Sequence, residues 1–468
     1  MRRSRWMAAL AVTALLAAGC GGSGGSGSEG GEGAAEDDGT LLVWTTEDLA
    51  DRVKTQQAIL NEWGKSTGTT VKLVAIAEDQ INTVIASAEA AGDRPDVIAA
   101  LSLNGMNQLA TDDLLDRDAA AAIVAELGAD TFFPRTLELT KAEDEQLAVP
   151  SDAWAQLLFY RKDLLSKAGV AEPKTFADLE AAAKALNKGK MAGIVAATAP
   201  ADSFTQQTFE HVAMANGCQL TNDAGDVTLN SPQCQEAMTF YTNLIKNYSV
   251  KGNQDADTTR AGYFAGTAGM TIWSSFMLDE LAGLRNDALP TCPECKKDRN
   301  FLVENTGVAT TLQGPGGAEP AAFGEVVSWS VLQDASPKAQ DLVTYMMSDG
   351  YPEWLGIAPE GKLPVRKGNA DNPEEYVQAW QKLQAGVDKK ALLSSIYPAE
   401  TLTAIAAVPG SFNRWGIPQG QGALAGAVGG QFVIPQALAS MLNSGVSAAD
   451  AASKAQEQAE QIKTDVGG

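Results

Sequence analysis

The chain has 468 residues, of which 45% are hydrophobic, and its 58 acidic and 35 basic residues give a formal net charge of -23 at pH 7. So acidic a surface repels nucleic-acid phosphates, which makes nucleic acid a poor partner. A chain of this length exceeds what one hydrophobic core usually supports, so two lobes are expected. Beyond the N-terminal segment, no stretch of the sequence is long and apolar enough to span a membrane.

The first 19 residues have the pattern of an export signal. Arg2, Arg3 and Arg5 precede an apolar run that ends in Leu-Ala-Ala-Gly before Cys20. The run is about 12 residues long, which is short of the roughly 20 residues of a transmembrane helix. The string Leu-Ala-Ala-Gly-Cys resembles a bacterial lipobox, which implies cleavage before Cys20 and a lipid on that cysteine. Cleavage by ordinary signal peptidase is the alternative.

Residues 21–39 contain nine Gly and no apolar residue larger than Ala. Such a segment cannot bury a core, so residues 20–39 are predicted to form a flexible tether. Loss of residues 1–19 would remove three arginines and leave the mature chain with a charge of -26. Lipid and tether together predict an extracytoplasmic domain that is anchored to the cell membrane.

Four cysteines lie beyond Cys20, an even number that suits an oxidising compartment. We expect the disulfides Cys218–Cys234 and Cys292–Cys295 because each closes a short local loop, although the sequence leaves crossed pairings open. A zinc site of four cysteines needs two close pairs, and only Cys292 and Cys295 are close. No metal site is therefore expected.

Strand and helix patterns alternate along the chain. Residues 41–44 read as a buried strand, and a helical pattern follows up to Trp63 and stops at Gly64 and Gly68. This alternation is typical of a parallel α/β sheet. Further strands are predicted at 71–77, 95–99, 157–160, 270–273 and 326–332, and further helices at 80–91, 337–347 and 447–463 and from residues 161 and 175 onward, the last with Thr175 as its cap and Asp178 at its third position.

Several short segments, in their order along the chain, resemble the extracellular solute-binding proteins that serve sugar-type ABC importers. Each segment is a weak signal alone, but together, behind the lipobox, they cover nearly the whole mature chain. The segments are Leu42-Val43-Trp44, Asn61-Glu62-Trp63, Arg94-Pro95-Asp96-Val97, Val149-Pro150, Phe159-Tyr160-Arg161-Lys162-Asp163-Leu164, Gly269-Met270-Thr271-Ile272-Trp273, Gly314-Pro315-Gly316, Ser336-Pro337-Lys338-Ala339 and Leu363-Pro364-Val365-Arg366.

The resemblance implies a two-lobed α/β fold, the Venus flytrap of periplasmic binding proteins, which closes by a hinge motion on a ligand in the cleft between the lobes. It also implies a monomer without cofactor or catalytic activity, which captures a sugar or oligosaccharide and delivers it to the permease subunits of an ABC transporter. The lobes are expected at 40–150 with about 327–372 (N-terminal) and at 151–326 with about 373–468 (C-terminal).

A sugar needs aromatic planes for its apolar faces, and carboxylates, amides and hydroxyls for its rim of hydroxyl groups. Trp44 ends the first predicted strand, where α/β sheets present their ligand crevices, and Thr46 and Glu47 follow it. The alternative is that Trp44 is core and the polar residues begin the next helix. Ser102 and Asn104 occupy positions at which the family's sugar binders often carry a charged group.

The other candidates lie at predicted crossings and strand ends. Trp154, with Asp152 close by, is near the first crossing, and Trp273, with Ser274, is the best single candidate for stacking. Trp329 suits a core face or a cleft wall equally. Trp415 lies in a Gly-rich loop where some relatives place another stacking residue. The remaining large indoles of the mature chain, Trp63, Trp354 and Trp380, are expected to be structural.

Two other functions stay open at this point. An extracellular glycoside hydrolase could use a pair of carboxylates that are distant in sequence, although His211 is the sole histidine and no nucleophile motif is present. A binder of cationic solutes such as polyamines would need several inward carboxylates with aromatic rings, for which Glu47, Asp152 and Trp273 are available.

Overall fold

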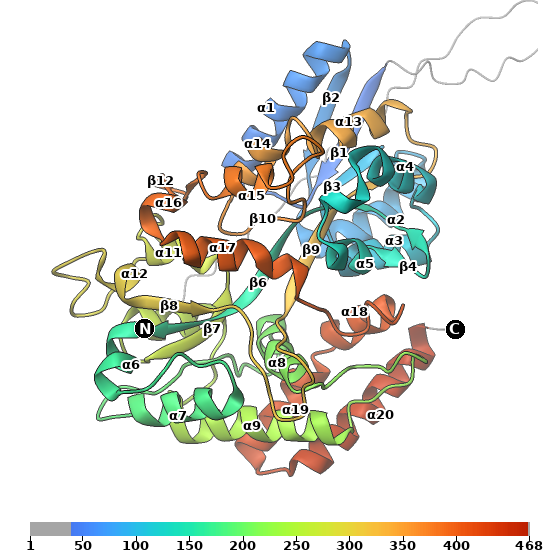
Figure 1. Cartoon of the computed structure of the whole chain (residues 1–468). Helices are drawn as coiled ribbons and strands as arrows, with labels where there is room; N and C mark the ends of the chain where they lie inside the picture. The colour runs from blue at the N-terminus through green and yellow to red at the C-terminus, as the bar shows by residue number, and fades with distance from the viewer. Residues whose placement is uncertain (1–38, 467–468) are drawn as a thin grey trace, which may run out of the picture. The chain divides into compact units, whose positions relative to one another are not determined.

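The computed structural model describes residues 39–466, so the predicted signal, Cys20 and most of the tether lie outside the described residues. An eight-stranded mixed sheet forms the scaffold (Figure 1). β1 (Thr40–Thr45) lies parallel between β2 (Thr70–Ala75) and β3 (Val97–Ser102). The parallel α/β pattern predicted for this part of the chain is confirmed.

β6 (Val149–Arg161) is the long strand that both parts of the sheet share. Its first half pairs with β9 (Gly324–Val331) and with the short β10 (Leu363–Pro364). Its second half pairs with β7 (Met270–Ser274) and β8 (Thr306–Ala309). Because β9 also pairs with β3, the sheet continues from one lobe into the other. β6, which includes Pro150, and β9 are therefore the strands that both parts of the sheet share.

One hydrophobic cluster, called here the first core, lies around β1, β3 and β9 and extends to the region of β7. The helices that pack into it are α1 (Ala50–Thr67), α2 (Ile81–Ala91), α3 (Leu103–Thr111), α4 (Arg117–Leu127), α5 (Pro134–Leu139), α10 (Ala256–Phe264), α11 (Met277–Leu281), α12 (Phe301–Asn305), α13 (Lys338–Met346), α14 (Tyr351–Gly356), α15 (Glu375–Trp380), α16 (Leu393–Ile396) and α17 (Ala399–Ala407). The hairpins β4–β5 (Lys141–Ala142, Glu145–Gln146) and β11–β12 (Gln384–Ala385, Ala391–Leu392) are small additions.

A second hydrophobic cluster, the second core, fills the other lobe. Its helices are α6 (Lys162–Ala168), α7 (Phe176–Leu186), α8 (Ser203–Ala215), α9 (Pro232–Tyr248), α18 (Gly422–Gly430), α19 (Val433–Ser444) and α20 (Ala448–Val466). Residues from about 373 to 410 were predicted for this lobe, but Tyr376, Trp380 and Leu402 are buried in the first core instead. From the C-terminal stretch, Trp415 and the helices α18 to α20 pack in the second core, where α19 and α20 contact α9, and α18 and α19 contact α8.

Local signals account for where several helices begin and end. Thr175 accepts the backbone N–H of Asp178, whose carboxylate accepts in return from Thr175, so the predicted cap of α7 is confirmed. α1 ends at Gly68, which adopts φ 70°, a left-handed conformation that glycine takes without strain. α20 begins beside Ser447, whose Oγ accepts the N–H of Asp450 at 3.1 Å.

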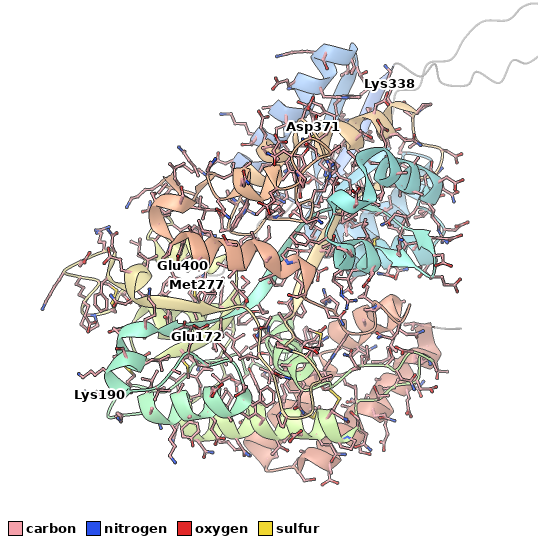
Figure 2. All side chains as sticks on the ribbon, in the orientation of Figure 1. Glu172, Lys190, Met277, Lys338, Asp371 and Glu400 are labelled. Atoms are coloured by element: carbon pink, nitrogen blue, oxygen red, sulfur yellow. A yellow bond between two sulfur atoms is a disulfide. The ribbon has the colours of Figure 1, made fainter. Side chains whose placement is uncertain are left out.

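Many charged side chains lie on the outside of the molecule. Lys190, Lys338, Asp371 and Glu400 are exposed and project from the ribbon, whereas Met277 is buried (Figure 2). Within residues 39–466 no single helix is long and apolar enough to cross a membrane. α18 and α19 together reach that length and composition, but they are bent by 44° and their apolar side chains lie in the second core.

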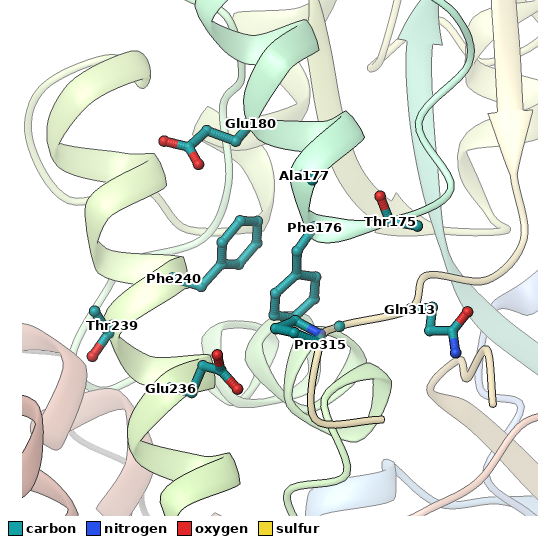
Figure 3. Close-up of a pocket in the computed structure, with 10 residues that line it drawn as sticks. Thr175, Phe176, Ala177, Glu180, Glu236, Thr239, Phe240, Gln313 and Pro315 are labelled. Carbon is teal, nitrogen blue, oxygen red and sulfur yellow. The ribbon is translucent and has the colours of Figure 1, made fainter. Parts of the chain in front are cut away.

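A pocket of about 440 Å³ lies between α7, α9 and the turn around Pro315 (Figure 3). The rings of Phe176 and Phe240 stack there with centroids 3.9 Å apart, and Glu180 and Glu236 lie on either side of them. A second pocket of about 390 Å³ lies between α1 and α14. None of the residues predicted to bind a solute lines either pocket.

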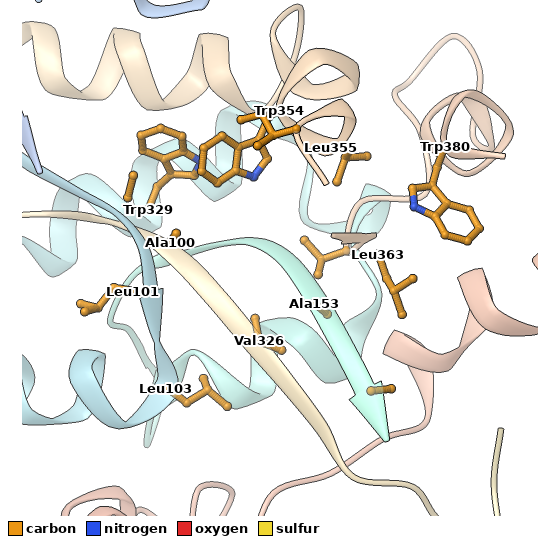
Figure 4. Packing of buried hydrophobic residues seen from close by; sticks show 14 of the residues in the cluster. Ala100, Leu101, Leu103, Ala153, Val326, Trp329, Trp354, Leu355, Leu363 and Trp380 are labelled. Atoms are coloured by element: carbon orange, nitrogen blue, oxygen red, sulfur yellow. The ribbon is translucent and has the colours of Figure 1, made fainter. Parts of the chain in front are cut away.

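Tryptophans make up much of the first core (Figure 4). The rings of Trp329 and Trp354 lie 4.8 Å apart in a tilted arrangement, and Trp380 donates its Nε1–H to the Pro359 carbonyl at 2.9 Å. Trp63, Trp354 and Trp380 are all buried, which confirms the structural role expected for them.

Both predicted disulfides are confirmed, with Cα–Cα distances of 4.6 Å for Cys218–Cys234 and 4.9 Å for Cys292–Cys295. The first ties the loop after α8 to the start of α9. The second disulfide cross-links two residues of the loop before α12.

Replacing Cys218 and Cys234 by serine is expected to lower the free energy of unfolding by about 3 kcal/mol, because that cross-link closes the longer loop. The same change at Cys292 and Cys295 should lower it by about 2 kcal/mol. Urea unfolding followed by tryptophan fluorescence measures both. A larger loss at Cys292 and Cys295 would contradict the loop-length argument.

Candidate functional site

A buried lysine, Lys362, joins two acids that the sequence predicted for the cleft, Glu47 and Asp152. Its Nζ lies 2.7 Å from Glu47 Oε1 and 3.2 Å from Asp152 Oδ2, although the lysine is only 1% exposed. The same ammonium sits 4.2 Å from the ring centroid of Trp354. A buried ammonium needs such partners because removing an unpaired charge from water is costly. Lys362 therefore fastens the loop after β1 to the start of β6.

Glu47 and Asp152 differ in what they leave open to a solute. Asp152 is 1% exposed, and its carboxylate accepts hydrogen bonds from Trp354 Nε1 and a neighbouring serine, both at 2.7 Å. Glu47 is partly exposed and also pairs with Arg52 at 2.9 Å. Burial disfavours its ionised form, but Lys362 and Arg52 outweigh that effect and hold the pKa of Glu47 at about 2. The structure assigns Asp152 to the scaffold, whereas Glu47 remains an accessible anion.

Trp273 lies near the end of β7 with its ring mostly covered. It is 8% exposed, and its Nε1 donates to the Ala256 carbonyl at 3.0 Å. The Arg260 guanidinium lies 5.6 Å from the ring centroid, and the Phe204 ring lies 5.9 Å away. Ser274, the next residue, is half-buried. The indole is thus held in one orientation, as a stacking platform requires, and a hydroxyl lies beside it.

Trp154 and Arg414 come together on the other side of β6. The Trp154 ring is half-buried and lies 5.5 Å from the Phe323 ring, on whose face the Arg414 guanidinium rests at 4.7 Å. Arg414 forms an ion pair with Glu325 of β9. Glu325 Oε1 also accepts the backbone N–H of Leu103, the first residue of α3, at 2.9 Å. One carboxylate therefore connects α3 to the segment that leads into α18.

The chain is strained where β3 ends near β1. Ala100 has φ 56°, a conformation that non-glycine residues rarely adopt, and the register of β3 with β9 shifts there. Thr46 Oγ1 donates to the Ala100 carbonyl at 2.6 Å and holds this turn. Ser102 then caps α3 by accepting a backbone N–H at 3.4 Å, and Asn104 is exposed in the first turn. Thr46 and Ser102 thus shape the crevice with hydroxyls already engaged.

Three of the predicted tryptophans are core residues in this structure. Trp44 packs in the first core beneath the crevice, and Trp329, 1% exposed, packs against Trp354. Trp415 is 2% exposed in the second core, where its backbone N–H donates to Glu210 at 2.7 Å and its Nε1 to the Cys218 carbonyl at 2.9 Å. Trp329 and Trp415 are fully enclosed by packing, whereas Trp44, at 7% exposure, is covered to about the same degree as Trp273.

Sequence reasoning did not single out Lys362, Arg52, Arg260 or Glu325. For Glu325 and Lys362 the sequence did contain a sign of burial. Glu325 directly precedes Val326-Val327, and Lys362 directly precedes Leu363-Pro364-Val365. A charge inside an apolar run predicts a buried charge with a partner. Arg52 and Arg260 lie on helix surfaces and had no such signal.

A second group of acids lies where α11 meets the loop after α14. Burial first, and then the facing Glu360 and the adjacent Glu280, raise the pKa of Asp279 well above its usual value. Neither carboxylate oxygen of Asp279 has a hydrogen-bond partner within residues 39–466. The elements meet closely, since a Cβ on Gly361 would lie 1.9 Å from the Phe276 ring. Burial without a hydrogen-bond partner favours the protonated, neutral form of a carboxyl group.

The described residues do not assemble a hydrolytic centre around the histidine. His211 is buried in α8, its Nδ1 accepts the N–H of Phe323 at 3.2 Å, and burial lowers its pKa to about 4. Within residues 39–466 no group of three or more His, Cys, Asp or Glu side chains could hold a metal ion. The accessible groups near the ends of β1, β3 and β7 are instead a carboxylate, hydroxyls, amides and an indole, which bind polar solutes.

Comparison with known proteins decides the family. The model for bacterial extracellular solute-binding proteins matches residues 46–351. The chain belongs to this family. YcjN of Escherichia coli, named as an ABC transporter periplasmic-binding protein, is 29% identical over 312 residues, which cover 65% of this chain and 67% of that protein. The residues matched by the family model include β6 and β9, and every residue predicted to bind a solute except Trp44 and Trp415.

Solved structures of this family share the fold. The cyclic α-maltosyl-1,6-maltose binding protein of Arthrobacter globiformis superposes with a TM-score of 0.70 at 19% identity, covering 91% of this chain and 99% of that one. The sugar-binding protein MalE of Xanthomonas citri also gives a TM-score of 0.70, at 17% identity and with coverage of 91% and 98%. The two-lobed α/β fold predicted from the sequence is confirmed.

The raised pKa of Asp279 predicts how stability depends on pH. The folded state binds a proton that the unfolded carboxyl, with an ordinary pKa of about 4, releases, so stability is full below that value and falls as the pH rises toward the folded pKa. Between pH 5 and pH 8 the wild-type protein should lose stability, and Asp279→Asn should lose less. Urea unfolding across this range measures the difference, and parallel curves for the two proteins would exclude a protonated Asp279.

Proposed function

We propose that this protein captures a sugar or oligosaccharide in the cleft between its lobes and delivers it to the permease of an ABC importer. The observation that carries the proposal is the family match over both lobes, with Trp273 held rigidly at the end of β7. Structures of the same fold are named as complexes with ribitol, α-D-tagatose and maltose. Glu47, Ser102, Asn104, Trp154 and Ser274 supply the remaining aromatic and polar contacts in this proposal.

A neutral solute fits the charges near the candidate cleft better than a cation. Glu47 is already paired with Lys362 and Arg52, and Asp152 is buried against the same lysine. The face of Trp273 lies beside the Arg260 guanidinium. A polyamine would need free carboxylates, so the ion pairing of Glu47 and Asp152 supports a sugar over a cationic solute.

The proposal also includes an extracytoplasmic place of action and no catalytic activity. Family membership supports the location and the role of binding. The lipid on Cys20 and the tether over residues 20–39 rest on the sequence, and we infer that they keep a monomeric binding domain near the permease, where the effective concentration favours transfer.

Trp273→Ala should weaken sugar binding about tenfold through the lost stacking surface. Thermal shift and calorimetry of the Cys20→Ser chain with ribitol, tagatose, maltose and spermidine measure this. Because a buried tryptophan also stabilises the fold by about 3–5 kcal/mol, Trp273→Phe and Ser274→Ala are measured beside it. Trp273→Phe should retain most of the affinity. Equal affinity of all variants would remove Trp273 from the site, and consumption of a sugar would favour an enzyme.

Cys20→Ser should move the protein from the membrane fraction to the soluble fraction, because the lipid has no other proposed attachment point. Detergent phase partition of cell extracts, with intact mass of the N-terminal peptide, measures this. Persistence of the variant in the detergent phase would favour a retained apolar segment as the anchor.

A further inference from the structure

α18 connects the two lobes although it belongs to one of them. In Figure 1 it lies between α3 on one side and α19 and α20 on the other. Its apolar side chains are in the second core, whereas those of α3 are in the first core. The residues concerned are Leu424, Ala425 and Val428 of α18 and Leu103, Met106 and Leu109 of α3. The contact between these helices is therefore a contact between lobes.

Gly422 is the closest point of that contact. A Cβ built on Gly422 would lie 2.3 Å from Asn107 Cγ of α3, far inside the van der Waals distance. A Cβ on Gly426 would meet Asn104 at 3.6 Å, an ordinary contact, and one on Gly430 would meet nothing within 4 Å. Asn107 cannot turn away freely, because its Nδ2 donates to the Leu103 carbonyl at 2.7 Å. A side chain at position 422 would therefore have to displace the Asn107 amide and break this hydrogen bond, or move the helices apart.

The same end of α3 carries residues of the proposed site. Ser102 caps the helix and Asn104 lies in its first turn, on the side that faces Gly426. Next to them, Glu325 accepts the Leu103 N–H and pairs with Arg414 on the way to α18. With Gly422 against the Asn107 amide, no sugar ring fits between the helices.

A separate contact joins α1 to the segment after β7. The Arg52 guanidinium lies 5.8 Å from the Phe276 ring centroid, and Phe276 also packs against Gly361. Both segments pack against the first core, so this contact, unlike that of α18 with α3, does not join the two cores.

We propose that the contact of Gly422 with Asn107 forms an end wall of the solute cleft, which limits the length of the sugar chain that the closed protein accepts. This inference rests on the proposed function for the identity of the solute. The contact itself is a property of α3 and α18 and can be measured without any solute.

Gly422→Ala should hold the lobes apart, because its methyl group overlaps the Asn107 amide. Nitroxide labels on Lys190→Cys and Lys338→Cys, both exposed and on different lobes, report the distance in the Cys20→Ser chain. The variant should show longer distances and at least about tenfold weaker binding of the sugar from the ribitol, tagatose and maltose panel that stabilises the parent. Gly430→Ala, the same change on the same helix without a neighbour, should match the parent in both.

Asn107→Ala in the Gly422→Ala background removes the overlapping amide and should restore the parent distance and bring affinity back to within about threefold. A Gly422→Ala protein with the parent's distances and affinity would overturn the inference, as would an equal loss in Gly430→Ala. Maltohexaose tests the end wall, since stabilisation by it equal to that by maltose would also overturn the proposal. If no sugar of the panel stabilises the parent protein, the proposed function is refuted. The distances between the nitroxide labels would still test the contact of Gly422 with Asn107.

Discussion

The arrangement of the cleft depends on one buried ammonium group. Lys362 lies in the interior, where an unpaired charge is not tolerated, so Glu47 and Asp152 must both lie within reach of it. Glu47 lies in the loop after β1, Asp152 near the start of β6, and Lys362 directly before β10. The lysine therefore fixes how the first lobe sits on the strand that leaves it, and it positions Glu47 at the edge of the crevice. Trp354 completes this arrangement by donating to Asp152.

The ion pairs also determine which groups near the cleft remain able to bind a solute. The chain carries a charge of -23, yet its acids near the cleft are already matched by Lys362, Arg52, Arg260 and Arg414. What remains accessible is a set of hydroxyls, amides, one paired carboxylate and partly covered indoles. Such a surface recognises neutral polar molecules through hydrogen bonds and stacking. The excess negative charge lies outside, where it keeps the protein soluble.

The lobes are joined by continuous secondary structure and by side-chain contacts. β6 and β9 run through both lobes, and Glu325 of β9 binds the start of α3 and Arg414 together. The contact of α18 with α3 adds a further connection, which is made by helices rather than by strands. In two-lobed proteins, contacts of this kind can change with a bound solute while the shared strands keep the fold.

The sequence by itself determined the alternation of strands and helices and the cap at Thr175, because each follows from local periodicity or capping. Short loop closure favoured the two observed disulfides but did not exclude the crossed pairings. It also indicated the family through short ordered segments. It could not distinguish a tryptophan in a cleft from one in a core. Trp329 and Trp415 have the polar neighbours of a site, but sheet pairing and packing bury them. Only the tertiary structure revealed Lys362, the placement of residues 373–410 with the first core and the approach of α18 to α3. Those features depend on segments that are hundreds of residues apart, and no local pattern encodes which of them meet.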